Sequence, residues 1–350
     1  MFGYSNSIVK ADLQQMADNP LPWNELNNKT VLVTGANGMI ATYIIYFLMY
    51  LNLEKCLNIK VIALSRNEKR AKDLFGDFWQ DERFQFLQQD ICDEIQYEST
   101  VDYIFHFAGN ASPFYIKTDP VGIMKSNLIG TFNVLDYAKL HHTEKVIFAS
   151  TREVYGENNQ VNSLTEESFG HIDCLEGRSC YPESKRAAET MCMSYFLQYG
   201  INFNTVRIAH SYGPGMKLGN DGRVMADLIT CAVRGEDIVL KSTGEALRAF
   251  CYVTDTVLGL FYILFKGKAA EAYNLANETE EISIRSLAEK IVSTVSHKKL
   301  SVVFQIPATQ SSTYCNYKRV GLDVSRLNAL GWQPIVDLHE GLRNTIKSFE

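Results

Sequence analysis

Short apolar runs alternate with longer helix-forming segments through the first 208 residues of the chain. Each run is five or six residues long and carries few charges, which is typical of buried strands. The runs lie at residues 30–34, 60–64, 84–88, 102–107, 145–149 and 204–208. Longer segments at residues 39–53, 120–141 and from 181 onward are expected to be helices. This alternation predicts an α/β fold with a doubly wound parallel sheet.

The pattern changes after residue 208, where two turn-rich stretches precede shorter elements. We expect helices at 223–234, 254–265 and 338–349, and strands at 238–241 and 247–253. The sequence therefore predicts a sheet domain over residues 29–208 and a smaller α/β substrate lobe over residues 209–350, beside the carboxyl edge of the sheet. Residues 1–28 form an N-terminal extension with a helix at residues 8–16.

A glycine-containing turn follows the first predicted strand, in the run Gly35-Ala36-Asn37-Gly38-Met39-Ile40-Ala41. Glycine at 35 permits a tight turn, glycine at 38 lets the backbone approach a pyrophosphate, and a small residue at 41 allows close packing of helix and strand. The next helix presents free N–H groups and a positive dipole end to phosphate. We assign Gly35, Asn37, Gly38, Met39 and Ile40 to a dinucleotide site. The alternative is an ordinary turn between strand and helix.

Further cofactor contacts are expected where the next strands end. No acidic residue follows the second strand, so Ser65 and Arg66 can accept a 2′-phosphate, which favours NADP slightly over NAD. Alternatively, Arg66 stacks on adenine or faces water. Asp90 and Ile91 end the third strand, where Asp90 can hold the adenine amino group, and Ala108 and Gly109 pass close to the cofactor. His106, inside an apolar strand, is expected to be a core histidine.

Candidate chemistry lies around Thr151, Tyr181 and Lys185. Thr151 closely follows the fifth strand, and Tyr181 and Lys185 are four residues apart, so on a helix they share one face. An ammonium group beside a phenol lowers the pKa of the phenol. A tyrosine tuned in this way, next to a hydroxyl that binds the same oxygen, is a general base for an alcohol. Together with a hydride acceptor, these residues predict alcohol oxidation.

Composition excludes several other classes. Hydrophobic content of 46% and charged content of 21% are ordinary for a globular protein, and a net charge of −6 argues against nucleic-acid binding. The longest apolar run, residues 39–53, is too short to cross a bilayer.

The eight cysteines form no CxxC pair, and we expect Cys92, Cys192, Cys231 and Cys251 to be buried thiols. No signal pattern begins the sequence. We expect a cytoplasmic protein without a metal.

Together these motifs resemble the extended short-chain dehydrogenase/reductase superfamily, whose sheet domain is a Rossmann fold, and in particular its nucleotide-sugar-modifying enzymes. The closest likeness is to UDP-glucuronate decarboxylases. It is carried by segments 149–151, 153–156, 177–181, 185–186, 188–192, 220–224 and 248–250. The resemblance implies a nucleotide-diphosphate sugar as substrate and a homodimer formed through helices 120–142 and 181–199. It also implies that Arg223 and Arg248 face the diphosphate or the sugar, where guanidinium binds phosphate with two hydrogen bonds.

Some positions depart from that pattern. His210 stands where these enzymes usually have asparagine. Arg152 stands where decarboxylases have serine and where 4,6-dehydratases have aspartate. The segment around Arg319 looks more like the corresponding segment of GDP-fucose synthases. Arginine cannot protonate a leaving hydroxyl, which argues against a standard dehydratase, but it can recognise a sugar carboxylate.

The same residues leave several reactions open. Tyr181 would take the proton of the sugar 4-hydroxyl while the cofactor takes the C4 hydride. The 4-keto sugar can then lose CO2, lose water or return as the 4-epimer. Glu153 would be an acid or base near C5, or alternatively the ion-pair partner of Arg152. A further alternative is a non-catalytic NADP-binding sensor or scaffold, since fold alone does not fix function.

Overall fold

The centre of the molecule is a parallel sheet of seven strands, seen in a computed structural model that describes residues 2–158, 161–219, 222–306 and 320–350. These strands are β1 (Thr30–Thr34), β2 (Lys60–Ser65), β3 (Phe84–Gln88), β4 (Tyr103–His106), β5 (Lys145–Thr151), β7 (Phe203–Ile208) and β12 (Glu271–Leu275). Their order is β12-β7-β5-β4-β1-β2-β3, and every neighbouring pair is parallel. The predicted doubly wound sheet is therefore confirmed. The chain order reverses between β1 and β4, where open α/β sheets bind ligands.

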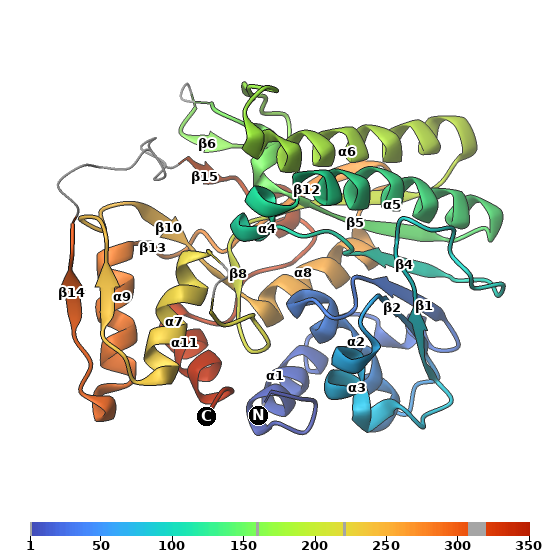
Figure 1. Cartoon of the computed structure of the whole chain (residues 1–350). Helices are drawn as coiled ribbons and strands as arrows, with labels where there is room; N and C mark the ends of the chain where they lie inside the picture. The colour runs from blue at the N-terminus through green and yellow to red at the C-terminus, as the bar shows by residue number, and fades with distance from the viewer. Residues whose placement is uncertain (1, 159–160, 220–221, 307–319) are drawn as a thin grey trace.

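Helices cover both faces of the sheet (Figure 1). On one face lie α5 (Pro120–Leu140) and α6 (Cys180–Tyr199). On the other face lie α1 (Ser7–Ala17), α2 (Met39–Glu54), α3 (Glu68–Phe75) and α8 (Val253–Lys266). Successive residues of a strand point to opposite faces, so Val31 and Val33 pack with α2 and α8, whereas Leu32 packs with α5. Both faces are apolar, which explains why the strands read as continuous apolar runs.

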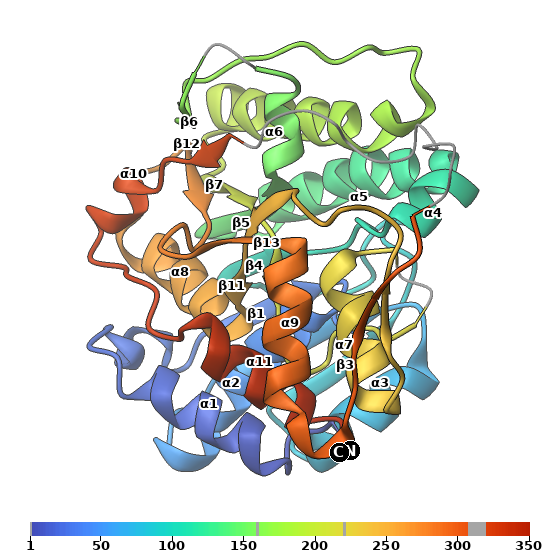
Figure 2. The ribbon, with the colours of Figure 1, turned by 90° about the vertical axis from the view of Figure 1, so that its left-hand side faces the viewer.

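The remaining elements form a smaller lobe beside the sheet, best seen in Figure 2. Its helices are α7 (Val224–Arg234), α9 (Ile284–Thr294) and α11 (Leu338–Lys347). Pairs of short strands brace it: β8 (Ser211–Tyr212) with β11 (Cys251–Tyr252), β9 (Ile238–Leu240) with β14 (Val302–Phe304), and β10 (Leu247–Ala249) with β13 (Glu281–Ser283). The strands β6 (Ser163–Leu164) and β15 (Gly321–Leu322) form a fourth pair, and the short helices are α4 (Pro113–Thr118) and α10 (Ser325–Asn328).

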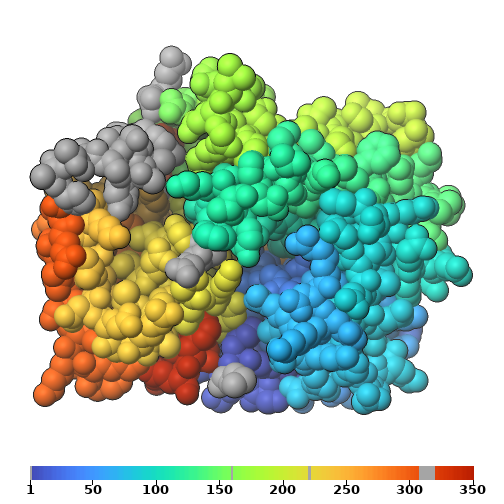
Figure 3. Space-filling model, viewed as in Figure 1, coloured from blue at the N-terminus to red at the C-terminus, as the bar shows by residue number. Residues whose placement is uncertain are grey.

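The lobe contacts the sheet domain next to α4. Figure 3 shows the teal surface of the α4 region adjacent to the yellow surface of the lobe. The Lys217 ammonium lies 5.3 Å from the centre of the Tyr115 ring. Lobe residues that precede α7 therefore lie close to the loop that follows β4.

The structure differs from the predicted lobe in two places. The strand predicted at residues 247–253 is two strands, since β10 pairs antiparallel with β13 and β11 pairs parallel with β8. The chain changes partner at Phe250, which a local apolar pattern cannot reveal. In addition, β12 from the lobe half of the sequence forms the edge of the central sheet, because Asn274 and Glu271 hid its strand pattern.

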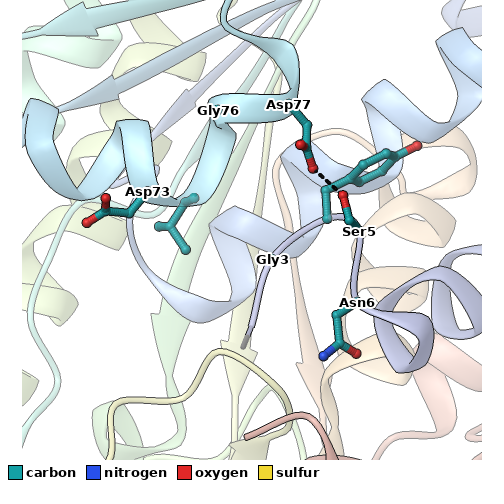
Figure 4. A pocket seen from close by; sticks show the side chains of 8 residues that line it. Gly3, Ser5, Asn6, Asp73, Gly76 and Asp77 are labelled. Atoms are coloured by element: carbon teal, nitrogen blue, oxygen red, sulfur yellow. Dashed lines mark hydrogen bonds between the residues drawn. The ribbon is translucent and has the colours of Figure 1, made fainter.

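The N-terminal extension packs on both halves of the chain. Asp12 is buried, and its carboxylate accepts hydrogen bonds from Tyr43 in α2 and Tyr252 in β11, at 2.7 and 2.9 Å. At the start of the extension Ser5 donates to Asp77, and this contact borders a surface pocket of about 360 Å³ (Figure 4). None of the residues that line this pocket is a predicted site residue.

Burial and membrane propensity can be compared with the predictions for the described residues. Cys192 and Cys251 are buried, whereas Cys92 and Cys231 are only half-buried, so the prediction for the latter two was wrong in degree. Within the described ranges, no helix has both the length and the apolar character that a membrane crossing requires.

Candidate active site

The end of β5 and the first turns of α6 bring three of the four predicted catalytic residues together. Thr151 is the last residue of β5, and its hydroxyl lies close enough to the buried Tyr181 phenol to lower the pKa of that phenol. One turn further along α6, the buried Lys185 Nζ donates to the Ala149 carbonyl at 2.7 Å. The Lys185 bond ties the start of α6 to β5. The hydroxyl, the phenol and the ammonium group all lie at the carboxyl edge of the sheet.

The pKa of Tyr181 differs from the prediction. Burial raises the pKa of Tyr181 well above its ordinary value, and the charge of Glu153 adds to the rise. The nearby Thr151 hydroxyl and the charges of Arg178 and Arg223 oppose this rise in pKa. The prediction that Lys185 lowers this pKa was wrong: Lys185 is directed at a strand carbonyl, and burial lowers its own pKa to about 8.

Glu153 and Arg152 lie in a short 3-10 helix, η3 (Arg152–Tyr155), and do not form an ion pair with each other. Glu153 Oε1 accepts a hydrogen bond from Arg178 Nη2 at 2.6 Å. Arg152 Nη2 donates instead to the Val320 carbonyl at 2.8 Å. Burial raises the pKa of Glu153, and the charges of Arg178 and Arg152 oppose that rise. Sequence reasoning did not single out Arg178, although it lies in the motif that ends at Tyr181.

The glycine turn has the geometry of a phosphate cradle. Gly35 has φ +67°, and a Cβ there would lie 2.6 Å from the Phe107 carbonyl oxygen, so only glycine fits. Gly38 is the N-cap of α2 and provides no side-chain cap, which leaves the first helical N–H groups of Met39 and Ile40 available. Asn37 donates to the Asn67 carbonyl, and its buried Oδ1 has no hydrogen-bond partner among the described residues. These features fit a bound dinucleotide.

At the ends of β2 and β3, the structure joins two predicted cofactor residues. Arg66 follows Ser65, its side chain is 78% exposed, and its Nη1 lies 3.3 Å from Asp90 Oδ2. The other carboxylate oxygen of Asp90 accepts from the Cys92 N–H at 2.9 Å. This backbone bond, and then the charge of Arg66, lower the pKa of Asp90. Ile91 is buried beside them.

Beyond β4, Ala108 and Gly109 approach Lys185. A Cβ on Gly109 would lie 3.5 Å from Lys185 Nζ and 2.7 Å from Asn127 Oδ1. Asn127 is buried in α5 and donates to Ser184 Oγ at 2.9 Å, whereas its Oδ1 has no partner among the described residues. Asn127 was missed by sequence reasoning. The available signal was weak, since Asn127 is one of two asparagines in α5, the other being Asn133.

His106 is a structural residue, as predicted. Its ring nitrogens lie 2.8 Å from Thr34 Oγ1 and 3.1 Å from Thr131 Oγ1, and burial lowers the pKa of His106 to about 3. Thr34 Oγ1 also accepts from the N–H groups of Phe107 and Ala108. The imidazole therefore stays neutral and fixes the backbone that leads to Gly109.

The predicted substrate residues lie further apart in the fold than the predicted catalytic residues do. Arg223 directly precedes α7, and its charge lowers the pKa of Tyr181, so it lies within electrostatic range of the phenol. Arg248 lies in β10 and donates to the neighbouring Leu247 carbonyl at 2.7 Å. Its approach to a substrate stays a prediction. His210, after β7, has φ +48° and packs edge-to-face on Phe250. Asn220, Asp221 and Arg319 lie outside the described residues.

Comparison with known proteins shows which class this fold and site belong to. The model of the NAD dependent epimerase/dehydratase family matches residues 31–276, and the chain belongs to this family. This confirms the resemblance inferred from the sequence.

Among curated proteins, the chain is similar to UDP-glucuronic acid decarboxylases. It is 33% identical to UDP-glucuronic acid decarboxylase 1 of Xenopus tropicalis over 327 residues, which cover 93% of this chain and 73% of that protein. It is 34% identical to UDP-glucuronic acid decarboxylase 6 of Arabidopsis thaliana over 317 residues, covering 90% and 87%.

Solved structures share the fold. UDP-glucose 4-epimerase of Thermotoga maritima with UDP-glucose superimposes with a TM-score of 0.75 at 24% identity, covering 91% of this chain and 98% of that chain. A dTDP-glucose 4,6-dehydratase of Streptomyces venezuelae with NAD bound gives a TM-score of 0.74 at 23% identity, covering 91% and 96%.

Proposed function

We propose that this chain is a cytoplasmic NAD(P)-dependent enzyme that oxidises a nucleotide-diphosphate sugar at C4 and acts as a UDP-glucuronate decarboxylase. The observation that carries the proposal is the grouping of Thr151 and the buried Tyr181 at the carboxyl edge of the sheet, where Lys185, one helical turn along α6, is hydrogen bonded to the Ala149 carbonyl of the same strand as Thr151. Similarity to UDP-glucuronic acid decarboxylases over nine-tenths of the chain supports the choice of substrate.

The first step removes the hydroxyl proton and the hydrogen on C4 of the sugar, which converts the C4 alcohol into a ketone. Tyr181 takes the hydroxyl proton as the phenolate, the form that the positive charges of Arg178 and Arg223 favour, and Thr151 would hold the same oxygen by a hydrogen bond. A bound nicotinamide cofactor supplies the hydride acceptor for the hydrogen on C4. Lys185 supplies positive charge beside Gly109, 3.5 Å from where a Cβ would stand. The residues that would hold the cofactor are those of the glycine turn, Ser65, Arg66, Asp90, Ile91 and Ala108.

The 4-keto sugar of a uronic acid is a β-keto acid. Its C5–C6 bond breaks as CO2 leaves, and the electron pair forms an enolate over C4 and C5. A proton then forms the new C5–H bond, and Glu153 is the acid that we assign to this step, because it lies close enough to Tyr181 to raise the pKa of the phenol. The hydride finally returns to C4. Arg152, Arg223 and Arg248 would bind the anionic groups of the substrate.

Cofactor preference and assembly belong to the same proposal. The exposed Arg66, with no acidic residue at the end of β2, supports a preference for NADP, although NAD is the cofactor named for the Streptomyces venezuelae dehydratase. The outer face of α5 and α6 exposes large apolar side chains, which supports a homodimer in which both helices pack against a second copy. These residues are Val121, Met124, Ile129, Phe132, Leu140, Met193 and Leu197.

The proposal is tested by incubating the enzyme with a panel of UDP-, GDP-, CDP- and dTDP-sugars and analysing the products by mass spectrometry. We expect UDP-glucuronate to lose the mass of CO2, while loss of water or a product of unchanged mass would indicate the dehydratase or the 4-epimerase instead. Tyr181→Phe should lower kcat by a factor of at least about 100, since it removes the general base. Full turnover by Tyr181→Phe would contradict the mechanism, and no reaction with any sugar would favour a non-catalytic binding protein.

A further inference from the structure

Arg178 interacts with both groups that the proposed reaction uses for proton transfer, since it is hydrogen bonded to Glu153 and its charge lowers the pKa of Tyr181. It belongs to a short 3-10 helix, η4 (Gly177–Ser179), that leads directly into α6 and Tyr181. Its guanidinium donates to Glu153 Oε1 at 2.6 Å and forms an ion pair that joins residues 25 positions apart. A short charge-assisted bond of this kind restricts the carboxyl group more than a neutral bond does.

The other charged and titratable groups near Glu153 cannot take this role. Arg152 in η3 acts on Glu153 through its charge, but its Nη2 is hydrogen bonded to the Val320 carbonyl. From α6, Tyr181 and Cys180 face Glu153, and neither group carries a positive charge. Arg178 is the cation seen in hydrogen-bond contact with the Glu153 carboxylate.

A carboxyl group that gives a proton to C5 must become a carboxylate in a place where burial opposes the charge. We propose that Arg178 is a positioning residue for Glu153, which orients its carboxyl group and stabilises the carboxylate left when the proton moves to C5. The step balances because the Glu153 O–H bond breaks as the C5–H bond forms, and water later returns a proton to Glu153. This inference rests on the proposed function.

The electrostatic part can be tested without turnover. The protein is labelled with ¹³C at the glutamate side-chain carboxyl carbon and titrated by NMR, and the Glu153 signal is assigned by its loss in Glu153→Gln. In Arg178→Gln we expect this signal to titrate at higher pH than in the wild type, and in Arg178→Lys at an intermediate pH. Glu183→Gln is the matched control, since it removes the neighbouring Glu183–Arg186 ion pair and should leave the titration unchanged.

Kinetics test the positioning role. If Arg178 acts through Glu153, Arg178→Gln should lower kcat about tenfold with little change in KM, because a positioning residue affects the proton transfer and not substrate binding. Glu153→Gln should lower kcat by about 100-fold or more. Adding Arg178→Gln to Glu153→Gln should change kcat by less than about twofold, since the partner is already absent. Both single variants should still form reduced cofactor, because C4 oxidation precedes the step they impair.

Three results would overturn the inference. One is an unchanged Glu153 titration in Arg178→Gln. Another is an equal loss of kcat when Arg178→Gln is added to Glu153→Gln, and the third is a rise in KM alone, which would make Arg178 a substrate ligand. If the wild type itself forms no reduced cofactor with any nucleotide sugar, the proposed function fails and the positioning role falls with it. The NMR titration would still report whether the ion pair sets the ionisation of Glu153.

Discussion

At the scale of single residues, the proposed preference for NADP rests on one exposed side chain, Arg66. It lies at the end of β2, where the 2′-position of an adenine ribose is expected, and it is already held toward Asp90. A guanidinium there binds a 2′-phosphate with charge-assisted hydrogen bonds, and a ribose hydroxyl gains much less from it.

We predict that Arg66→Ala weakens binding of NADPH about tenfold and changes binding of NADH by less than about twofold, as expected for the loss of one partly exposed charged hydrogen bond. Dissociation constants of the cofactor-free protein can be measured from the fluorescence of the reduced cofactors. Arg70→Ala, which removes another exposed arginine one helical turn away, serves as the control. Equal losses for the two cofactors would contradict a role of Arg66 in selectivity.

The sequence allowed a residue to be placed where its position follows from the local pattern of a helix or strand. Tyr181 and Lys185 share a helix face at a spacing of four, and Thr151 ends a recognisable strand, so their grouping could be predicted. The Arg178–Glu153 pair joins two short 3-10 helices, whose path no periodicity encodes. The pKa of Tyr181 depends on burial, which exists only in the folded chain.

At the scale of elements, α5 and α6 each have one face on the sheet and one apolar face outward. Leu197 is 76% exposed and Leu140 is 71% exposed, although both helices are otherwise well packed. Phe132 on α5 contacts Tyr195 on α6 edge-to-face, so the two outward faces are continuous. Such a surface on two adjacent helices is suited to forming a four-helix bundle with a second copy.

We predict that Leu197→Glu converts the protein from a dimer into a monomer, because the substitution places a charge in the apolar interface. Light scattering after gel filtration should give twice 39.6 kDa for the wild type and 39.6 kDa for the variant. Leu53→Glu, at an exposed leucine of α2 on the opposite face, should remain dimeric. A wild type of monomer mass at micromolar concentration would rule out this assembly.

Element prediction succeeded where the local pattern was sufficient. The strand at residues 30–34 was predicted with the observed ends, and the helix predicted over residues 39–53 ends one residue later, at Glu54. Both are largely buried, which gives them mainly apolar sequences. β12 was missed because buried Asn274 interrupts its apolar pattern. That asparagine is satisfied by the Leu164 and Asp323 carbonyls and by Tyr155, which are distant in sequence.

At the scale of the whole molecule, Asp12 connects the extension to both halves of the chain. Burial is the main reason why the pKa of Asp12 is raised to about 7, while hydrogen bonds from Tyr43 and Tyr252 oppose the rise. An aspartate in the unfolded chain has a pKa of about 4. Between these two pH values the folded protein retains a proton that the unfolded chain has released. Asp12 therefore makes the free energy of unfolding fall as pH rises from about 4 to about 7.

We predict that Asp12→Asn gains stability relative to the wild type as pH is raised from 5 to 8, by up to about 1.4 kcal/mol for each pH unit within the titration range. Urea unfolding at several pH values measures the difference. His106 has the opposite pH dependence, but it is present in both proteins and cancels. Asp255 has the same pH dependence as Asp12, and since the charge of Asp12 helps to raise the pKa of Asp255, Asp12→Asn also reduces the contribution of Asp255. Asp18→Asn, at an exposed aspartate at the end of α1, is the control. A difference that does not vary with pH would exclude this role.

The first and last helices also meet. The Asn6 side chain donates to the Ser348 carbonyl at 3.5 Å, and Figures 1 and 2 both show the two ends of the chain side by side. A short peptide could thus join them and turn the backbone into a closed ring, in which new ends could be opened at another surface loop. Because a ring has fewer conformations to lose on folding, circularisation would favour the native state without altering one contact at the catalytic edge.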